Sequence, residues 1–155
     1  MPIANMVQSC LSEYKIDYEL APHPKTHSSH ETAQAAHIPD DHIAKAVIVE
    51  DAQGYAMVVI PASNWLKLHA LNEEVDRDFQ ITDETVLQEL FGDCQPGAIP
   101  PLGPCYKLET FLDEQLTTLA NIYFEAGDHK HLLHISGEAF HALLKGVRHG
   151  HFSHR

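Results

Sequence analysis

The segment from Ala44 to Ile60 constrains the fold more than any other part of the chain. Ala44–Glu50 is rich in β-branched residues and alternates in the manner of a strand. Asp51–Gly54 supplies turn residues, and Tyr55–Ile60 returns as a second apolar run that Pro61 stops. The sequence therefore predicts an antiparallel hairpin around which the other elements assemble.

Shorter patterns on both sides of this hairpin predict a mixture of helices and strands. Helices are expected at 3–14, 28–37, 65–71, 83–91 and 138–145, and strands at 18–21, 79–81, 121–125 and 132–135. Thr82 is the expected cap of the fourth helix and Ser136 of the fifth, whereas the Pro- and Gly-rich stretch at 95–104 breaks every regular pattern. Because the elements follow no strict βαβ rhythm, an α/β fold with one strongly curved, mixed sheet is expected.

Composition is that of one ordinary globular domain spanning residues 1–155. Apolar residues make up 44% of the 155 residues, and no run of eighteen apolar residues predicts a membrane span. The first residues lack the pattern of a secretory signal, and the three cysteines are widely separated without a C-x-x-C pair. We therefore expect no disulfide, a cytoplasmic location, and a polar, frayed, histidine-rich tail at 148–155.

The formal net charge of −12 restricts the possible partners. Tight, general binding of nucleic acid requires basic surface, which this balance excludes. Any contact with RNA must therefore be local, at one strand end, or be supplied by a partner protein. The thirteen histidines make the charge less negative near pH 6.

Lys45 is a charged residue inside an otherwise apolar strand. Lysine is rarely buried without a partner, so its ammonium must reach a cavity, an acid or a bound anion. One interpretation is an edge-strand lysine that discourages aggregation. The other is a cation directed into a pocket, where it meets phosphate or carbonyl oxygens.

The stretch from Gly97 to Gly103 is the second candidate for a functional site. Glycine allows a ligand to approach the backbone, while Pro100 and Pro101 stiffen the chain. Backbone N–H groups of such a loop can stabilise an oxyanion without a catalytic side chain. The alternative is a rigid connector between two elements.

Two histidine clusters invite a metal interpretation without fitting a zinc pattern. They comprise His23, His27 and His30 near the N-terminus and His149, His151 and His154 near the C-terminus. Neither is accompanied by a cysteine or carboxylate at recognisable spacing. The sequence also lacks a phosphate-binding glycine loop, a G-x-S-x-G elbow and an H-E-x-x-H motif. No metal and no cofactor are therefore expected.

Four features, taken in order, resemble the YbaK/ProX family of aminoacyl-tRNA editing domains. They are the helix around Thr32 and Ala33, Lys45 at the start of the hairpin, the loop Gly97-Ala98-Ile99-Pro100-Pro101-Leu102-Gly103, and Tyr123-Phe124-Glu125-Ala126-Gly127. The loop resembles the family's Gly-x-x-x-Pro element. The resemblance extends from about His23 to Leu144, nearly the whole chain.

The resemblance implies a barrel-like, curved mixed sheet flanked by helices, and hydrolysis of the ester that joins a small amino acid to a tRNA 3′ end. Lys45 would be the catalytic residue, holding a phosphate or carbonyl of the substrate while water or a substrate hydroxyl attacks. The residues implied in substrate binding are Gly97, Ala98, Ile99, Pro101, Gly103, Gly127, Thr32 and Glu125. Members that remove cysteine carry a small hydroxyl residue at the position of Glu125, which leaves the amino acid accepted here open.

Three functions remain distinguishable by experiment. The first is a free-standing deacylase whose partner is the aminoacyl end of tRNA. The second is a non-catalytic module of the same fold that binds an aminoacyl or nucleotide ligand, or an aminoacyl-tRNA synthetase. The third is a histidine-based metal protein. The sequence leaves open the oligomeric state and whether Lys107 or Arg148 assists at the RNA backbone.

Overall fold

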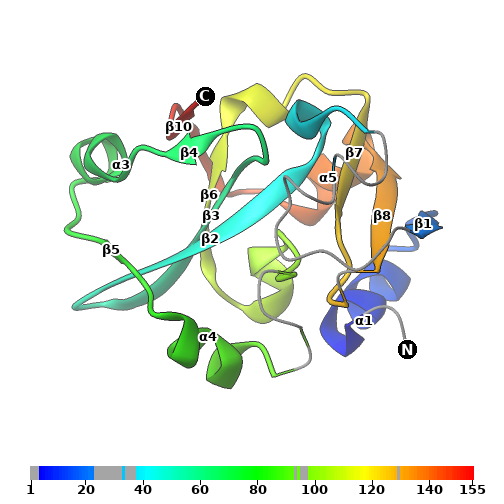
Figure 1. The fold of residues 1–155 in the computed structure, drawn as a ribbon, viewed down its shortest axis with the longest axis horizontal. Helices are drawn as coiled ribbons and strands as arrows, with labels where there is room; N and C mark the ends of the chain where they lie inside the picture. Colours follow the sequence, from blue (N-terminus) through cyan, green and yellow to red (C-terminus); the bar gives the residue numbers. More distant parts are fainter. Residues whose placement is uncertain (1–3, 23–32, 34–37, 93, 95–97, 129) are drawn as a thin grey trace.

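The computed structural model describes residues 4–22, 33, 38–92, 94, 98–128 and 130–155. It is a mixed α/β fold in which two sheets enclose a hydrophobic core and helices lie at the periphery (Figure 1). In spatial order the larger sheet contains β5 (Gln80–Ile81), β2 (Ala44–Asp51), β3 (Gly54–Pro61), β6 (Glu109–Asp113) and β9 (Arg148–Gly150). The smaller sheet contains β1 (Glu19–Pro22), β8 (His131–Ser136) and β7 (Asn121–Glu125).

The predicted hairpin is confirmed and forms the centre of the larger sheet. Strands β2 and β3 pair antiparallel from Ala44 opposite Pro61 to Asp51 opposite Gly54. Strand β6 then adds parallel to β3, and β9 adds parallel to β6. The mixed character of the sheet is therefore as expected.

The two sheets meet at one end of the hairpin. A parallel bridge joins Ile43, just before β2, to Tyr123 of β7. Figure 1 shows β2 running from this junction, near β7, toward the opposite side of the molecule. The described strands do not close into a barrel, so the structure shows the mixed α/β fold without the barrel-like closure.

Helices cover the ends and edges of the sheets. The described α-helices are α1 (Asn5–Glu13), α3 (Leu68–Val75), α4 (Glu84–Leu90) and α5 (Gly137–Leu143). Short 3-10 turns are η1 (Asp40–His42), η2 (Gly103–Tyr106) and η3 (Glu114–Leu116). None of the helices in the described part of the chain is long and apolar enough to cross a bilayer.

The interior consists of three clusters, and side-chain alternation assigns the residues of β2 to two of them. Ala44 and Ile48 belong to the main core, which also contains residues of α1, β7, β8 and α5. Val49 belongs to the hairpin core, which α3 covers. The junction cluster consists of Ala33, Ile43, Ala62 and Leu132.

Local patterns predicted several elements correctly. Helices α1 and α5 and strands β1, β5, β7 and β8 lie within a few residues of their expected positions. Ser136 caps α5 as predicted, since its side chain accepts a hydrogen bond from the Ala139 N–H. Of the helix expected at 28–37 only Ala33 lies within the described residues, and it is helical and buried.

Two predictions about helix starts are wrong. Helix α4 is capped by Asp83, whose side chain accepts from the Thr85 N–H, and not by Thr82, which is buried. The helix expected from Trp65 begins only at Leu68, because Trp65 and Leu66 form strand β4. The partner of β4 is β10 (Ser153–His154), nearly ninety residues later, which local periodicity does not reveal.

The predicted frayed tail is wrong for the same reason. Residues 148–150 form β9 beside β6, and Phe152 is fully buried in the hairpin core. The Lys67 N–H donates to the Phe152 carbonyl at 2.7 Å, and the Phe152 N–H donates to the Asp113 carboxylate at 3.1 Å. The C-terminal residues are therefore part of the fold.

The expectation of no disulfide is also wrong. Cys10 of α1 and Cys105 of η2 are bonded, with their Cα atoms 6.0 Å apart. They are separated by 95 positions in the sequence, and only the packing of α1 against η2 brings them together. Spacing along the chain carried no sign of this pair.

Candidate active site

Lys45 lies at the start of β2, close to the junction of the two sheets. It is half-buried, and alternation places it on the face of β2 that also carries Val47 and Val49. Its neighbour across the hairpin is Ile60, which is fully buried. The backbone of a central hairpin thus holds this lysine in a fixed position against apolar surroundings.

The ammonium group of Lys45 has an aromatic neighbour and no acidic one. Its Nζ atom lies over the ring of Trp65, 5.4 Å from the ring centroid, which is within cation–π range. Among the described residues, no carboxylate forms an ion pair with it. Burial lowers the pKa of this ammonium, since the charged form loses hydration.

This environment bears on the two interpretations of Lys45. A lysine that only protects a sheet edge extends into water, where its charge is solvated. Lys45 is instead half-buried beneath an indole ring. A cation in that setting is suited to an incoming anion or to a carbonyl oxygen that develops negative charge.

Glu125 lies at the end of β7 and is 2% exposed. It pairs with Leu132 of β8, a member of the junction cluster, and it shares a face of β7 with Tyr123. Ile43, which precedes β2, belongs to the same cluster and is bridged to Tyr123. Lys45 and Glu125 therefore both follow the point at which the two sheets join.

The described part of the predicted loop packs elsewhere. Ala98 is fully buried, Pro101 is buried, and Ile99 and Leu102 pack with the main core. That core lies on the face of β2 opposite to Lys45. The structure thus shows no contact between Lys45 and these loop residues, and Gly97 and Thr32 lie outside the described residues.

The two described glycines of the predicted site have structural roles. Gly103 begins η2 and lies so close to Thr110 that an added Cβ would be 1.9 Å from its Oγ1 atom. Gly127 has a φ of 117° and lies against Ala4, whose N–H donates to the Ala126 carbonyl at 2.8 Å. Both glycines are required by the local geometry of the chain.

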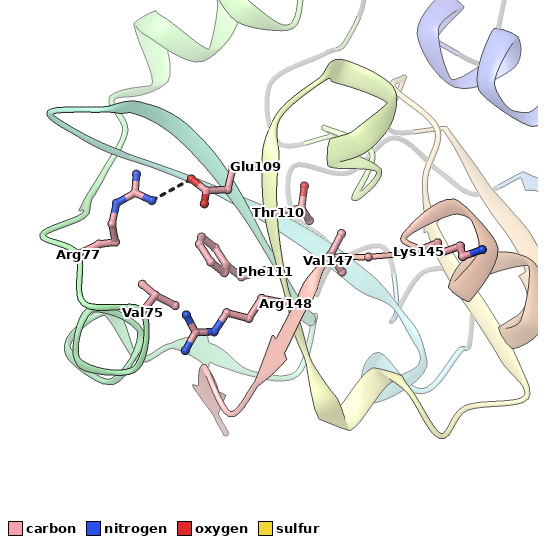
Figure 2. Close-up of a pocket in the computed structure, with 9 residues that line it drawn as sticks. Val75, Arg77, Glu109, Thr110, Phe111, Lys145, Val147 and Arg148 are labelled. Carbon is pink, nitrogen blue, oxygen red and sulfur yellow. Dashed lines mark hydrogen bonds and ion pairs between the residues drawn. The ribbon is translucent and has the colours of Figure 1, made fainter.

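A second group of cations lies at the other end of the hairpin. A surface hollow of about 360 Å³ is lined by Arg77, Lys145 and Arg148, three of the ten Lys and Arg residues (Figure 2). Arg77 donates to Asp51 through Nε and through Nη2 at 2.9 Å, and to Glu109 through Nη1 at 3.0 Å. Its charge is therefore already balanced by two carboxylates.

The other two cations of this hollow do not converge on one point. Arg148 donates to the Glu74 carbonyl at 2.7 Å, and Figure 2 shows Lys145 on the far side of Val147 from both arginines. Lys107, considered above with Arg148 as an RNA contact, is the exposed residue that follows η2. The hollow therefore presents no concentrated charge for a phosphate group.

The C-terminal histidines do not assemble into a metal site. His149 lies on β9 and His154 on β10, while the Nε2 atom of His151 lies 3.2 Å from the Glu114 carboxylate. Within the described ranges no group of three or more His, Cys, Asp or Glu side chains is arranged to hold a metal ion. The N-terminal cluster at 23–30 lies outside those ranges.

Trp65 is the residue of the site that sequence analysis assigned to another role. It was expected to begin the helix at 65–71, yet it lies in strand β4 and is 71% exposed beside Lys45. The only available sign was that this single tryptophan follows directly on the predicted hairpin. Its position depends on the pairing of β4 with β10, which no local pattern indicates.

Comparison of the sequence with known protein families identifies the family of this chain. The profile of the aminoacyl-tRNA editing domain matches residues 23–143. The chain belongs to the aminoacyl-tRNA editing domain family. The match includes Lys45 and the loop at 97–103, so the resemblance drawn from the sequence motifs is confirmed at the level of the family. A comparison with curated proteins found no match.

Solved structures share the fold of this editing domain at low sequence identity. A proposed trans-editing enzyme for prolyl-tRNA synthetase superposes with a TM-score of 0.83 at 22% identity, covering 100% of this chain and 99% of that one. A protein from work on computational epitope grafting gives 0.82 at 22% identity, with the same coverage. A proposed signal transduction protein from Marinobacter aquaeolei VT8 gives 0.78 at 19% identity, covering 97% of this chain and 30% of that one. At such identities the likeness establishes the fold alone.

Proposed function

We propose that this editing domain is a trans-acting deacylase that hydrolyses the ester of a mischarged tRNA carrying a small amino acid. The observation that carries the proposal is Lys45, a half-buried cation without an acidic partner among the described residues, within the segment that the family profile matches. The structural relative described as a trans-editing enzyme is consistent with this function.

The proposed reaction needs little beyond one positioned cation. Water adds to the ester carbonyl carbon, the carbonyl oxygen becomes an oxyanion, and the bond to the ribose oxygen then breaks. The ribose oxygen takes up a proton, and the products are a free amino acid and an uncharged tRNA. The Lys45 ammonium stabilises the oxyanion, a contribution that grows where water is partly excluded.

Selection among amino acids would depend on size. A pocket discriminates one methylene by only about 1–3 kcal/mol, so larger residues are rejected better than smaller ones. Glu125, buried beyond the junction cluster, is the acidic residue proposed to influence which small residue is accepted. The net charge of −12 favours a contact limited to the 3′ end of the tRNA.

The decisive experiment is deacylation of Ala-, Ser-, Thr- and Cys-tRNA by the wild type and by Lys45→Ala. Turnover of one ester by the wild type, lost in a folded Lys45→Ala variant, supports the deacylase and names the substrate. Absence of turnover on all four, with binding of charged or uncharged tRNA or of a synthetase, would replace it with the non-catalytic module.

The proposed place of action is the cytoplasm, where charged tRNAs are used. A reducing compartment would keep Cys10 and Cys105 as two thiols close in space. Acid quenching of cells followed by alkylation and mass spectrometry measures this directly. Alkylation of both residues agrees with a cytoplasmic location, and a protected pair indicates an oxidising compartment.

A further inference from the structure

Trp65 is an unusual surface residue in this protein. It is the single tryptophan of the chain and, at 71%, the most exposed of the large hydrophobic side chains described. A lone exposed apolar side chain needs no explanation in general. This one differs because its ring lies against the half-buried ammonium of Lys45, with most of its surface open to solvent.

A partly buried polar network holds the strand that carries Trp65. The neighbouring Asn64 is 3% exposed and donates to Gln115 at 2.8 Å and to Ser153 at 3.0 Å. Ser153 in turn donates to the buried carboxylate of Asp113 at 2.7 Å. Strand β4 is therefore fixed from below, although the indole itself faces water.

The C-terminal strand completes this support. β10 pairs antiparallel with β4, and His154 lies opposite Trp65. Figure 1 shows the two short strands side by side at the C-terminal end of the chain. An exposed ring on a preorganised backbone loses little conformational freedom when a flat ligand stacks on it.

We propose that Trp65 is a stacking platform for the base of a nucleotide. Lys45 contacts a charged or ester oxygen of the same nucleotide. This inference rests on the deacylase proposed above and adds the residue that holds the terminal adenosine of the substrate. A cation beside an aromatic ring matches the two parts of a nucleotide, a flat base and a nearby anionic group.

The charge of the protein favours such a platform. A net charge of −12 disfavours many phosphate contacts, so an uncharged source of affinity is advantageous. Stacking of a base on an aromatic side chain provides affinity that salt hardly affects. If Lys45 makes the single phosphate contact, the logarithm of the binding constant falls with the logarithm of salt with a slope of about −0.7.

Because the chain has a single tryptophan, its fluorescence reports directly on ligand binding at Trp65. We would titrate the wild type with adenosine monophosphate and with the trinucleotide CCA and follow indole fluorescence. Saturable quenching is expected, with a weak salt dependence. Lys45→Met keeps the indole and removes the charge, so it should still be quenched, with lower affinity.

Variants separate stacking from general damage. Trp65→Leu should weaken binding of dye-labelled CCA, measured by anisotropy, by about 5- to 150-fold, and Trp65→Phe should retain most of it. Tyr14→Leu is the matched control, since Tyr14 directly follows α1, is 51% exposed and should change nothing. In deacylation, Trp65→Leu should raise KM and leave kcat unchanged, because the stack forms before the reaction.

The outcomes distinguish this inference from the deacylase itself. Quenching by CCA without turnover of any ester would retain the platform and reject the deacylase. Turnover with an unchanged KM in a folded Trp65→Leu variant would retain the deacylase and overturn the platform. Loss of binding to a synthetase alone, with CCA affinity intact, would show that Trp65 contacts a protein and would also overturn it.

Discussion

Two cations lie near opposite ends of β2, and their surroundings differ. Lys45, at the start of the strand, has an indole ring as its neighbour, and burial lowers its pKa. Arg77 contacts Asp51, at the end of the strand, together with Glu109. The hydrogen bond to Asp51 raises the pKa of Arg77, and the same bond lowers the pKa of Asp51.

The difference separates a cation whose charge is compensated within the fold from the one that we propose to be functional. Arg77 joins the loop before β5 to the hairpin turn and to β6, and its side chain is 14% exposed with its charge compensated within the fold. Lys45 is held by the same hairpin but lacks such compensation among the described residues. A cation left in this state is available to a substrate, at some loss of stability.

The largest expected effect is the loss of turnover in Lys45→Met. Removing one group that stabilises an oxyanion lowers kcat by about 100- to 1,000-fold. The melting temperature should stay constant or rise, because the variant removes a poorly hydrated charge. Single-turnover deacylation and thermal unfolding measure the two quantities. A variant that unfolds readily and retains kcat would give Lys45 the structural role.

The opposite result is expected for Arg77→Met. The substitution leaves the carboxylates of Asp51 and Glu109 without their cation, so the melting temperature should fall by several degrees. The rate of deacylation below the transition should equal that of the wild type. Arg77→Lys, which keeps the charge and loses the bidentate geometry, should lie between the two. An unchanged melting temperature of Arg77→Met would contradict the structural role of Arg77.

A substitution can also give Lys45 the acidic partner that Arg77 already has. Trp65→Glu places a carboxylate at the exposed position above Lys45, where Trp65→Gln places a neutral group of the same size. The glutamate should pair with Lys45, raise its pKa, and lower kcat/KM about two- to fivefold relative to the glutamine. Equal activity of the two variants would mean that the charge of Lys45 does not reach the substrate.

The smallest expected effects are the pH dependence of CCA binding, through Lys45, and the pH dependence of stability, through Asp51 and Arg77. Because the pKa of Lys45 is lowered from its ordinary 10.5, CCA affinity should decrease as pH rises through that lower value, and Lys45→Met should lack this decrease. Asp51 has a pKa below its ordinary 3.8, so its stabilisation is complete above 3.8 and is lost as pH falls through the lower value. Urea unfolding of the wild type and Arg77→Met across acidic pH measures the second effect.

Local sequence patterns were sufficient for part of this molecule. The hairpin at 44–60, the strands at 121–125 and 132–135, and the Ser136 cap follow from residues close in the sequence. The unusual position of Lys45 in an apolar strand was visible for the same reason. Each of these inferences depends on alternation, turn residues or capping, which are local properties.

The remainder depended on contacts between distant segments. The pairing of β4 with β10 and the bond between Cys10 and Cys105 each join positions 87 or more residues apart. The burial of Phe152 likewise was not visible in a local pattern. The exposure of Trp65 follows from the first of these contacts. The loop at 98–103 was predicted as irregular, but its packing on the face opposite to Lys45 was not predicted.

The central claim is that Lys45, and not Arg77, is the cation that acts on the substrate. The most direct test is single-turnover hydrolysis of one accepted mischarged tRNA by the wild type, Lys45→Met and Arg77→Met under identical conditions. We predict release of the amino acid at equal rates by the wild type and Arg77→Met, and at least a hundredfold slower release by Lys45→Met. Equal rates for the wild type and Lys45→Met would contradict the account.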